Sequence, residues 1–239
     1  WAGSEYIHGW MGVAMFIQDK PIGFINLDSK TAGIYTEEHA VLVQTFANQA
    51  ATAIKNARLF ELEQKRRKES ELVRQAATIL SSLLDLPSLH EAILEWLGKI
   101  VPYDSASIME IEGAHIRITA TRGLQNPEKA LNHIFPVDHV LFKIARETGE
   151  PLILEDCDDD PRFERWAETS KIRGWMGVPL ITRGQVTGYI TIDRHIPNTF
   201  TKNDAHIAQI FAHQAANSLE NTRLYRASQA GVEIDLIVR

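Results

Sequence analysis

The sequence predicts an α+β protein in which helices flank an antiparallel sheet. Three observations support this prediction: a long helical pattern free of glycine and proline, a set of short alternating segments joined by tight turns, and an internal repeat. The chain has 239 residues, 44% of them apolar, so its length suits one or two domains with a sizeable core. Because short turns join the expected strands, these strands should pair antiparallel.

The internal repeat is the strongest signal in the chain. Trp10 matches Trp175, an offset of 165 residues (175 − 10), and at this offset residues 7–60 align with residues 172–225 without a gap. The offset is too long for a solenoid repeat, so each copy should be a whole domain with its linker. We therefore predict the C-terminal part of a first domain at 1–60, a linker helix at 61–84, a complete second domain at 85–225 and the start of a following linker at 226–239.

The longest expected element is a helix of about 72 Å over residues 37–84, which contain neither glycine nor proline. Thr36 can cap this helix at its start. Apolar residues recur along it at alternating spacings of three and four, which is the heptad pattern of a coiled coil, with polar interruptions at Arg66 and Glu69. The pattern predicts a parallel homodimer with a seam of Leu59, Leu62, Val73, Ala76, Leu80 and Leu83.

The remaining elements follow in order along the second copy. Pro87 is a stop signal for the long helix, and an apolar stripe predicts a second helix at residues 88–101. Arg183–Gly184 marks a hairpin turn, and Thr201 with Asp204 forms a variant of the capping box. The pattern further predicts strands at 105–111, 116–121, 152–154, 175–182 and 186–193, helices at 139–147 and 201–227, and an acidic loop at 155–162.

Composition disfavours several classes of function. The net charge is −6 and no long basic tract occurs, which argues against nucleic-acid binding. No apolar run reaches the roughly 18 residues of a membrane span, and the single cysteine, Cys157, suits a reducing compartment. We therefore expect a cytoplasmic fragment without nucleic-acid or membrane contacts. It begins at Trp1 inside a copy, so we expect a longer parent protein.

A combination of short motifs occurs in the second copy, at residues 83–100, 103–108, 121–124, 145–151, 160–163, 177–180 and 200–225. Together these stretches resemble the GAF domain family, and the resemblance covers essentially all of residues 70–225. It implies a PAS-like, twisted antiparallel sheet of about six strands. It also implies a regulatory role, because such domains bind a small molecule or tetrapyrrole, or only dimerise. They control histidine kinases, diguanylate cyclases, phosphodiesterases and transcription activators.

The resemblance implies a ligand site between one sheet face and residues 133–170. Tyr189 and Thr191 share one face of their expected strand, and this more polar face is the candidate pocket wall. In an alternative that stays open, the aromatic residues only fill the core and Arg162 pairs with the acidic loop. The candidate ligand-binding residues are His139, Phe142, Asp156, Cys157, Arg162, Phe163, Trp166, Trp175, Tyr189 and Thr191.

The sequence leaves the cofactor unknown. Cys157 lies among carboxylates, which disfavour its thiolate, and it lacks the neighbouring residues of the bilin-binding relatives, so we expect no covalent bilin. A haem on His133 or His139, a non-covalent tetrapyrrole and a cyclic nucleotide remain weaker alternatives. His206 and His213 lie two helical turns apart, too far for one metal ion, so we expect no metal site.

These observations predict a sensory module that has no catalytic residues. It would bind an unidentified small molecule and pass the resulting change along its helices. We expect the output domain, a histidine kinase in the first instance, outside this chain. Two alternatives stay open: a ligand-free dimerisation spacer, and a redox enzyme of the same fold that depends on Cys157.

Overall fold

The computed structural model describes residues 6–131, 133–166 and 169–230. The Cα positions group into two compact units, residues 1–68 and residues 69–239, and each is described by itself. Helix α1, Glu37–Ser82, begins in the first unit and ends in the second.

The first unit is a β-hairpin followed by the start of α1. Gln18 and Asp19 form the two-residue turn with φ angles of 46° and 63°, the left-handed conformation that a tight hairpin turn favours. The amide of His39 donates to Oγ1 of Thr36 at 3.3 Å, so Thr36 caps α1 as predicted. The two strands pair antiparallel and are β1 (Gly9–Ile17) and β2 (Lys20–Ser29).

The second unit is built on one six-stranded antiparallel sheet, which confirms the predicted fold class. The strand order across the sheet is β5-β4-β3-β8-β7-β6. The sequence pattern does not predict β5, because three residues show too little alternation. The strands are β3 (Ser105–Glu112), β4 (His115–Arg122), β5 (Ile134–Pro136), β6 (Leu152–Leu154), β7 (Gly174–Thr182) and β8 (Gln185–Arg194).

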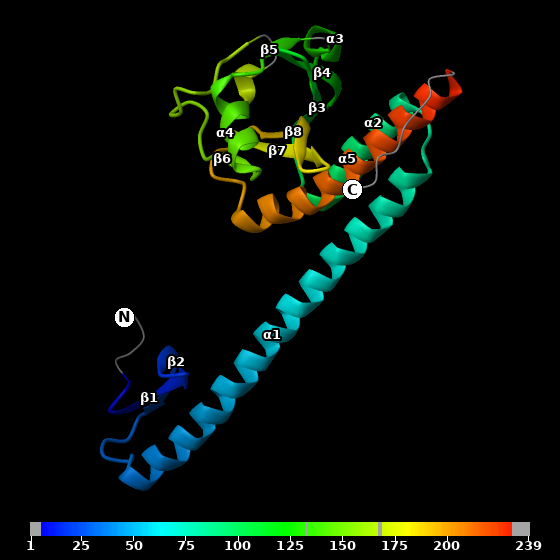
Figure 1. The fold of residues 1–239 in the computed structure, drawn as a ribbon. Helices are drawn as coiled ribbons and strands as arrows, with labels where there is room; N and C mark the ends of the chain where they lie inside the picture. The colour runs from blue at the N-terminus through cyan, green and yellow to red at the C-terminus, as the bar shows by residue number, and fades with distance from the viewer. Residues whose placement is uncertain (1–5, 132, 167–168, 231–239) are drawn as a thin grey trace. The chain divides into compact units, whose positions relative to one another are not determined.

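Helices cover both faces of this sheet. The end of α1 packs with α2 and α5 on one face, and α4 lies on the other (Figure 1). Asp85 accepts a hydrogen bond from the amide of Ser88 at 3.0 Å, and Pro87 lies in the first turn of α2, so this proline begins a helix. Thr201 and Asp204 form the predicted capping box. The helices are α2 (Leu86–Ile100), α3 (Pro127–Ala130), α4 (Val140–Thr148) and α5 (Lys202–Gln229), with a 3₁₀ turn at Thr169–Lys171.

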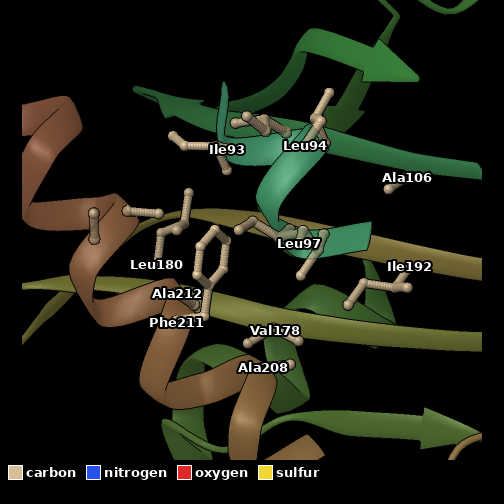
Figure 2. Close-up of a cluster of buried hydrophobic side chains, with 14 of the residues drawn as sticks. Ile93, Leu94, Leu97, Ala106, Val178, Leu180, Ile192, Ala208, Phe211 and Ala212 are labelled. Atoms are coloured by element: carbon tan, nitrogen blue, oxygen red, sulfur yellow. The ribbon is translucent and has the colours of Figure 1, made fainter. Parts of the chain in front are cut away.

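The main core lies between the sheet and the helices α2 and α5 (Figure 2). Leu97 of α2 and Phe211 of α5 are fully buried there, in one cluster with Val178 of β7 and Ile192 of β8. Each side chain of this size stabilises the fold by about 1.5–3 kcal/mol relative to exposure. The alternating apolar residues of the central strands therefore fix which face of the sheet the long helices cover.

The last turns of α1 belong to this core, which corrects part of the expected coiled-coil seam. Ala76 and Leu80 are fully buried in the same cluster, so they are unavailable to a second chain in this packing. Leu59 and Leu62 are 49% and 57% exposed. The heptad spacing continues through α1 because one helix serves two different packing environments in turn.

The repeat in the sequence is also a repeat in local structure. Trp10 pairs with Asp28 across β1 and β2, and the matching residues Trp175 and Asp193 pair across β7 and β8. Both hairpins carry a register irregularity at the corresponding point near the turn. A helix follows each hairpin, α1 in the first copy and α5 in the second.

The two copies differ in what covers their apolar residues. Trp175 and Tyr189 are 5% and 0% exposed, whereas their counterparts Trp10 and Phe24 are 62% and 66% exposed. Within residues 6–68, the described elements are a hairpin and the first part of α1, without counterparts of β3 or α4. Among the described residues, the hairpin of the first unit therefore lacks the elements that bury the matching apolar residues of the second unit.

Candidate functional site

The candidate site lies on the sheet face opposite α2 and α5. Along β8, Ile192 points to the main core, while Thr191 and Asp193 point to the other face. Ser107 of β3 and Trp175 of β7 line the same face. Helix α4 and the segment after β6 cover this face, which is the polar side of β8 that alternation predicts as a pocket wall.

These elements surround a partly open cavity of about 50 Å³. One water molecule needs at least about 10–15 Å³ in the same measure. The space therefore suits a compact molecule of a few non-hydrogen atoms, and a larger one would need the covering segment to move. The wall is mainly apolar and aromatic with a few polar groups, which is typical of small-molecule sites.

Aromatic side chains form much of the cover. The rings of Phe135 and Phe142 meet edge to face with their centroids 5.5 Å apart, and Phe142 meets Trp175 in the same manner at 6.3 Å. Trp166 stacks on His133 with 4.1 Å between ring centroids. Both geometries are favourable for aromatic pairs. They hold α4, β5 and the segment after β6 together around the cavity.

His139, directly before α4, contributes an unusual polar group to the wall. Its side chain is 7% exposed, and neither ring nitrogen makes a hydrogen bond among the described residues. Nε2 lies 3.9 Å from Oε2 of Glu164, which is too long for a hydrogen bond. Burial lowers the pKa of His139 and favours the neutral ring. A buried nitrogen without a hydrogen bond lowers the stability of the fold by about 1–3 kcal/mol. A ligand that formed this hydrogen bond would therefore bind favourably.

Asp193 is the second buried polar group of the cavity. Its carboxylate Oδ2 accepts a hydrogen bond from the hydroxyl of Ser105 at 2.8 Å, and it makes no ion pair within the described ranges. Burial raises the pKa of Asp193 to about 7, and the nearby Asp104 adds to the rise. Burial therefore favours the protonated carboxyl group more than water does, and a positive charge in the cavity would favour its ionised form.

Gly177 shapes the cavity by leaving room for an indole ring. A Cβ atom at this position would lie 2.4 Å from Cη2 of Trp175, which precedes it by two residues on the same face of β7. The glycine thus lets the ring lie along the strand. Trp10 and Gly12 repeat this arrangement in the first unit, where the corresponding distance is 2.5 Å.

The structure places six of the ten predicted ligand residues around the cavity and four outside its wall. Asp156 is bound by Arg173, whose Nε donates to its Oδ1 at 2.9 Å. Arg162 donates from Nε to Oδ1 of Asp160 at 2.9 Å, which fits the alternative in which it pairs with the acidic loop. Neither Asp156 nor Arg162 lines the cavity. The predicted residues that do line it are His139, Phe142, Phe163, Trp166, Trp175 and Thr191.

Cys157 and Tyr189 are buried beside the cavity and do not line it. The hydroxyl of Tyr189 donates to the carbonyl oxygen of Phe142 at 3.0 Å, which ties β8 to α4. Burial raises the pKa of the Cys157 thiol to about 12, and the carboxylate of Asp193 contributes to the rise. The thiol is therefore protonated at neutral pH, which makes it a weak nucleophile.

Sequence reasoning missed a large part of the cavity wall. The alternation of Tyr189 and Thr191 along β8 continues to Asp193, so this residue could have been predicted from the sequence. Ser107 follows the same rule on β3. The other missed residues mostly come from loops and short elements, where no period connects a residue to a face. The lining residues absent from the prediction are Ser107, Met109, Ile118, Leu124, Phe135, Leu141, Glu164, Thr169, Ile172 and Asp193.

Two searches of the described residues bear on other kinds of site. No group of three or more histidine, cysteine, aspartate or glutamate side chains comes together there in a way that could hold a metal ion. Among the helices in these same ranges, none is both long enough and apolar enough to cross a bilayer.

A six-stranded antiparallel sheet with helices on both faces is an architecture found mostly in sensory and regulatory domains of signalling proteins. The family model of the GAF domain matches residues 1–54 and 85–219. The chain belongs to the GAF domain family.

Solved structures share this fold at low sequence identity. The GAF domain of a phosphoenolpyruvate-protein phosphotransferase from Coxiella burnetii has a TM-score of 0.58 and 18% identity, with 66% of this chain and 96% of that chain covered. The free methionine-R-sulfoxide reductase of Neisseria meningitidis has a TM-score of 0.56 and 17% identity, covering 65% and 90%. A GAF domain/HD domain protein from Geobacter sulfurreducens has a TM-score of 0.53 and 18% identity, covering 61% and 98%. GAF domains of other proteins and a reductase thus share the fold.

Proposed function

We propose that the second unit is the ligand-sensing domain of a cytoplasmic signalling protein and performs no catalysis itself. One observation carries this proposal: an aromatic cavity that contains, among the described residues, a buried histidine whose ring nitrogens make no hydrogen bond and a buried carboxyl group without a counter-ion. Polar groups kept in this state inside a pocket are typical of functional sites. The chain has a single cysteine, which cannot form a disulfide within the chain. This composition agrees with a reducing compartment such as the cytoplasm.

We further infer that the chain contains parts of two GAF domains in tandem, with the boundaries expected from the sequence. The equal register of the two hairpins and the helix after each support this arrangement. The exposed apolar residues of the first unit, Trp10 and Phe24 among them, agree with an incomplete copy. In this scheme α1 is the last helix of one domain and the first helix of the next.

A ligand in the cavity could act on the helices through the sheet. Strands β7 and β8 place Trp175 and Thr191 toward the cavity and Val178 and Ile192 toward α2 and α5. The hydroxyl of Thr222 in α5 donates to the carbonyl oxygen of Leu83 at 3.0 Å, directly after α1. A change in sheet geometry would therefore bias the packing of both long helices. Two alternative packings of these helices would be the switching element.

The partner we propose is a second copy of this chain, associated in parallel through α1. Leu59 and Leu62 are exposed enough to meet a second helix, while Val73 and Leu83 are partly buried within their own unit. The output we propose is a histidine kinase outside the chain, one of the effectors that GAF domains control. Neither nucleic acid nor membrane is a proposed partner.

A redox enzyme of this fold is the weaker candidate. The Neisseria meningitidis structure is a methionine sulfoxide reductase with its substrate, so the fold permits that chemistry. Here the single cysteine is buried, and its raised pKa keeps the thiol protonated. A ligand-free spacer remains the second candidate, because a cavity of about 50 Å³ is small.

Native mass spectrometry of freshly purified protein tests the sensing proposal. The expected result is a mass increase from a retained small molecule, lost in Gly177→Ala because the new Cβ displaces the ring of Trp175. Gly12→Ala is the matched control, since it meets Trp10 in the same way outside the cavity. An unliganded wild-type protein whose melting temperature responds to no compound of a small-molecule library would favour the spacer.

A further inference from the structure

The charges around the cavity have one sign. Asp193 is buried in its wall, and Glu164 lies at its edge with 74% of the side chain exposed. No lysine or arginine is among the described residues that line it. Between residues 131 and 171, the positions outside the described ranges are Asn132, Ala167 and Glu168, and none of them is basic.

The arginines of the covering segment are committed to other carboxylates. Arg162 is bound to Asp160, and Arg173 holds Asp156 with a second contact to Asp158. Arg165 also pairs with Asp158 and donates to the backbone oxygens of Thr169 and Ile172. The acidic loop therefore neutralises the nearest positive charges, and the carboxyl group of Asp193 keeps no counter-ion within the described residues.

Acceptor atoms outnumber donors on these two buried side chains, which favours a ligand that donates hydrogen bonds. The ionised carboxylate of Asp193 accepts only, from Ser105 among the described residues, and a neutral His139 offers one acceptor and one donor nitrogen. The rings of Phe142, Trp166 and Trp175 present aromatic surface to the same space, which attracts cations as well as apolar groups. An anion would meet repulsion from Asp193 without any basic side chain to offset it.

We propose that this pocket prefers a compact monocation, a protonated amine on a small apolar group, over neutral and anionic molecules of the same shape. The inference rests on the proposed function and adds the charge of the ligand to it. The volume limits the ligand to a few non-hydrogen atoms in the present packing.

Three probes of nearly equal shape test the preference: isobutylamine, isobutyramide and isobutyrate, which are cationic, neutral and anionic at pH 7.5. Dissociation constants are measured by ligand-observed NMR with the full chain. We expect the amine to bind at least about tenfold more tightly than the carboxylate and about threefold more tightly than the amide. Equal or tighter binding of the amide or the carboxylate would overturn the inference, as would a failure of all three to bind.

Two variants connect the preference to one carboxyl group. In Asp193→Asn, the amine should lose its advantage over the amide, while Asp28→Asn, the matched position of the first copy, should keep it. An amine preference that persists in a folded Asp193→Asn protein would contradict the assignment. Native mass spectrometry separates this inference from the proposed function. A retained neutral or anionic molecule would contradict only the preference for a cation and would still support ligand sensing.

Discussion

His139 and Asp193 occupy positions where packing alone favours apolar residues. Burial lowers the pKa of His139 and raises the pKa of Asp193, because it destabilises the charged form of each. Such groups reduce stability unless a partner satisfies them. Their presence in the same cavity is the reason for proposing a binding site there.

Replacing His139 by phenylalanine should stabilise the ligand-free second unit. The substitution removes two ring nitrogens that make no hydrogen bond to a described residue, and the adjacent cavity gives room for the larger ring. We expect the free energy of unfolding to rise by about 1–2 kcal/mol in urea titrations of refolded, ligand-free protein. His133→Phe is the control, because His133 is half-buried and stacked on Trp166, and it should change stability little. A destabilised His139→Phe variant would mean that the ring nitrogens are satisfied.

Asp193 should give the stability of the second unit a distinctive pH dependence. Its pKa is about 7 in the folded protein and close to 4 in the unfolded chain, so the folded state binds the proton more tightly. Stability from this group is therefore present below pH 4 and is lost as the pH rises toward 7. Between pH 5 and 7.5, wild type should lose about 2 kcal/mol relative to Asp193→Asn.

Urea unfolding at a series of pH values measures this difference. Asp28→Asn is the matched control. Asp28 is the equivalent position in the first copy, and its side chain is exposed. Parallel pH profiles of wild type and Asp193→Asn would show that Asp193 does not titrate in this window.

At the scale of elements, the heptad pattern of α1 covers two parts of the helix with different surroundings. Its residues up to about Leu62 are largely exposed, whereas Ala76 and Leu80 complete the core of the second unit. Apolar residues at spacings of three and four suit both a second helix and the surface of a sheet domain. The spacing alone therefore cannot separate association from folding.

Charged substitutions at two positions of α1 should have different consequences. Leu80→Asp buries a charge in the core and should lower the free energy of unfolding by more than about 3 kcal/mol. Leu62→Asp should leave stability within about 0.5 kcal/mol but weaken self-association in analytical ultracentrifugation. If Leu62→Asp associates like wild type, the proposed parallel dimer does not use this part of α1.

At the scale of the whole chain, two hairpins with the same register should differ in dynamics. The hairpin β7–β8 is covered on both faces, while β1–β2 exposes Trp10 and Phe24. Local opening depends on buried contacts more than on the hydrogen bonds of the ladder. We expect amide exchange in β1–β2 to be at least about 100-fold faster than at matched positions of β7–β8, as measured by hydrogen–deuterium exchange. Equal protection would mean that another surface covers the first hairpin.

Much of the fold follows from the sequence because local signals agree with the tertiary packing. The capping residues Thr36 and Thr201, the turn at Arg183–Gly184 and the alternation of β8 each act within a few residues. Period and capping fix such features without any long-range contact. The short strand β5 and most of the cavity wall lack a local signal, and they form only when distant segments meet.

The sequence by itself determined the class of this protein, the order of its main elements, the repeat and the polar face of β8. These depend on periodicity, turn residues and self-similarity, which are properties of neighbouring positions. Only the tertiary structure decided that Asp193 and His139 share a cavity, that Arg162 and Arg173 are bound by the acidic loop, and that Leu80 belongs to a core. Those outcomes depend on which segments approach one another in space, because burial and charge pairing are set by contacts between residues far apart in the chain.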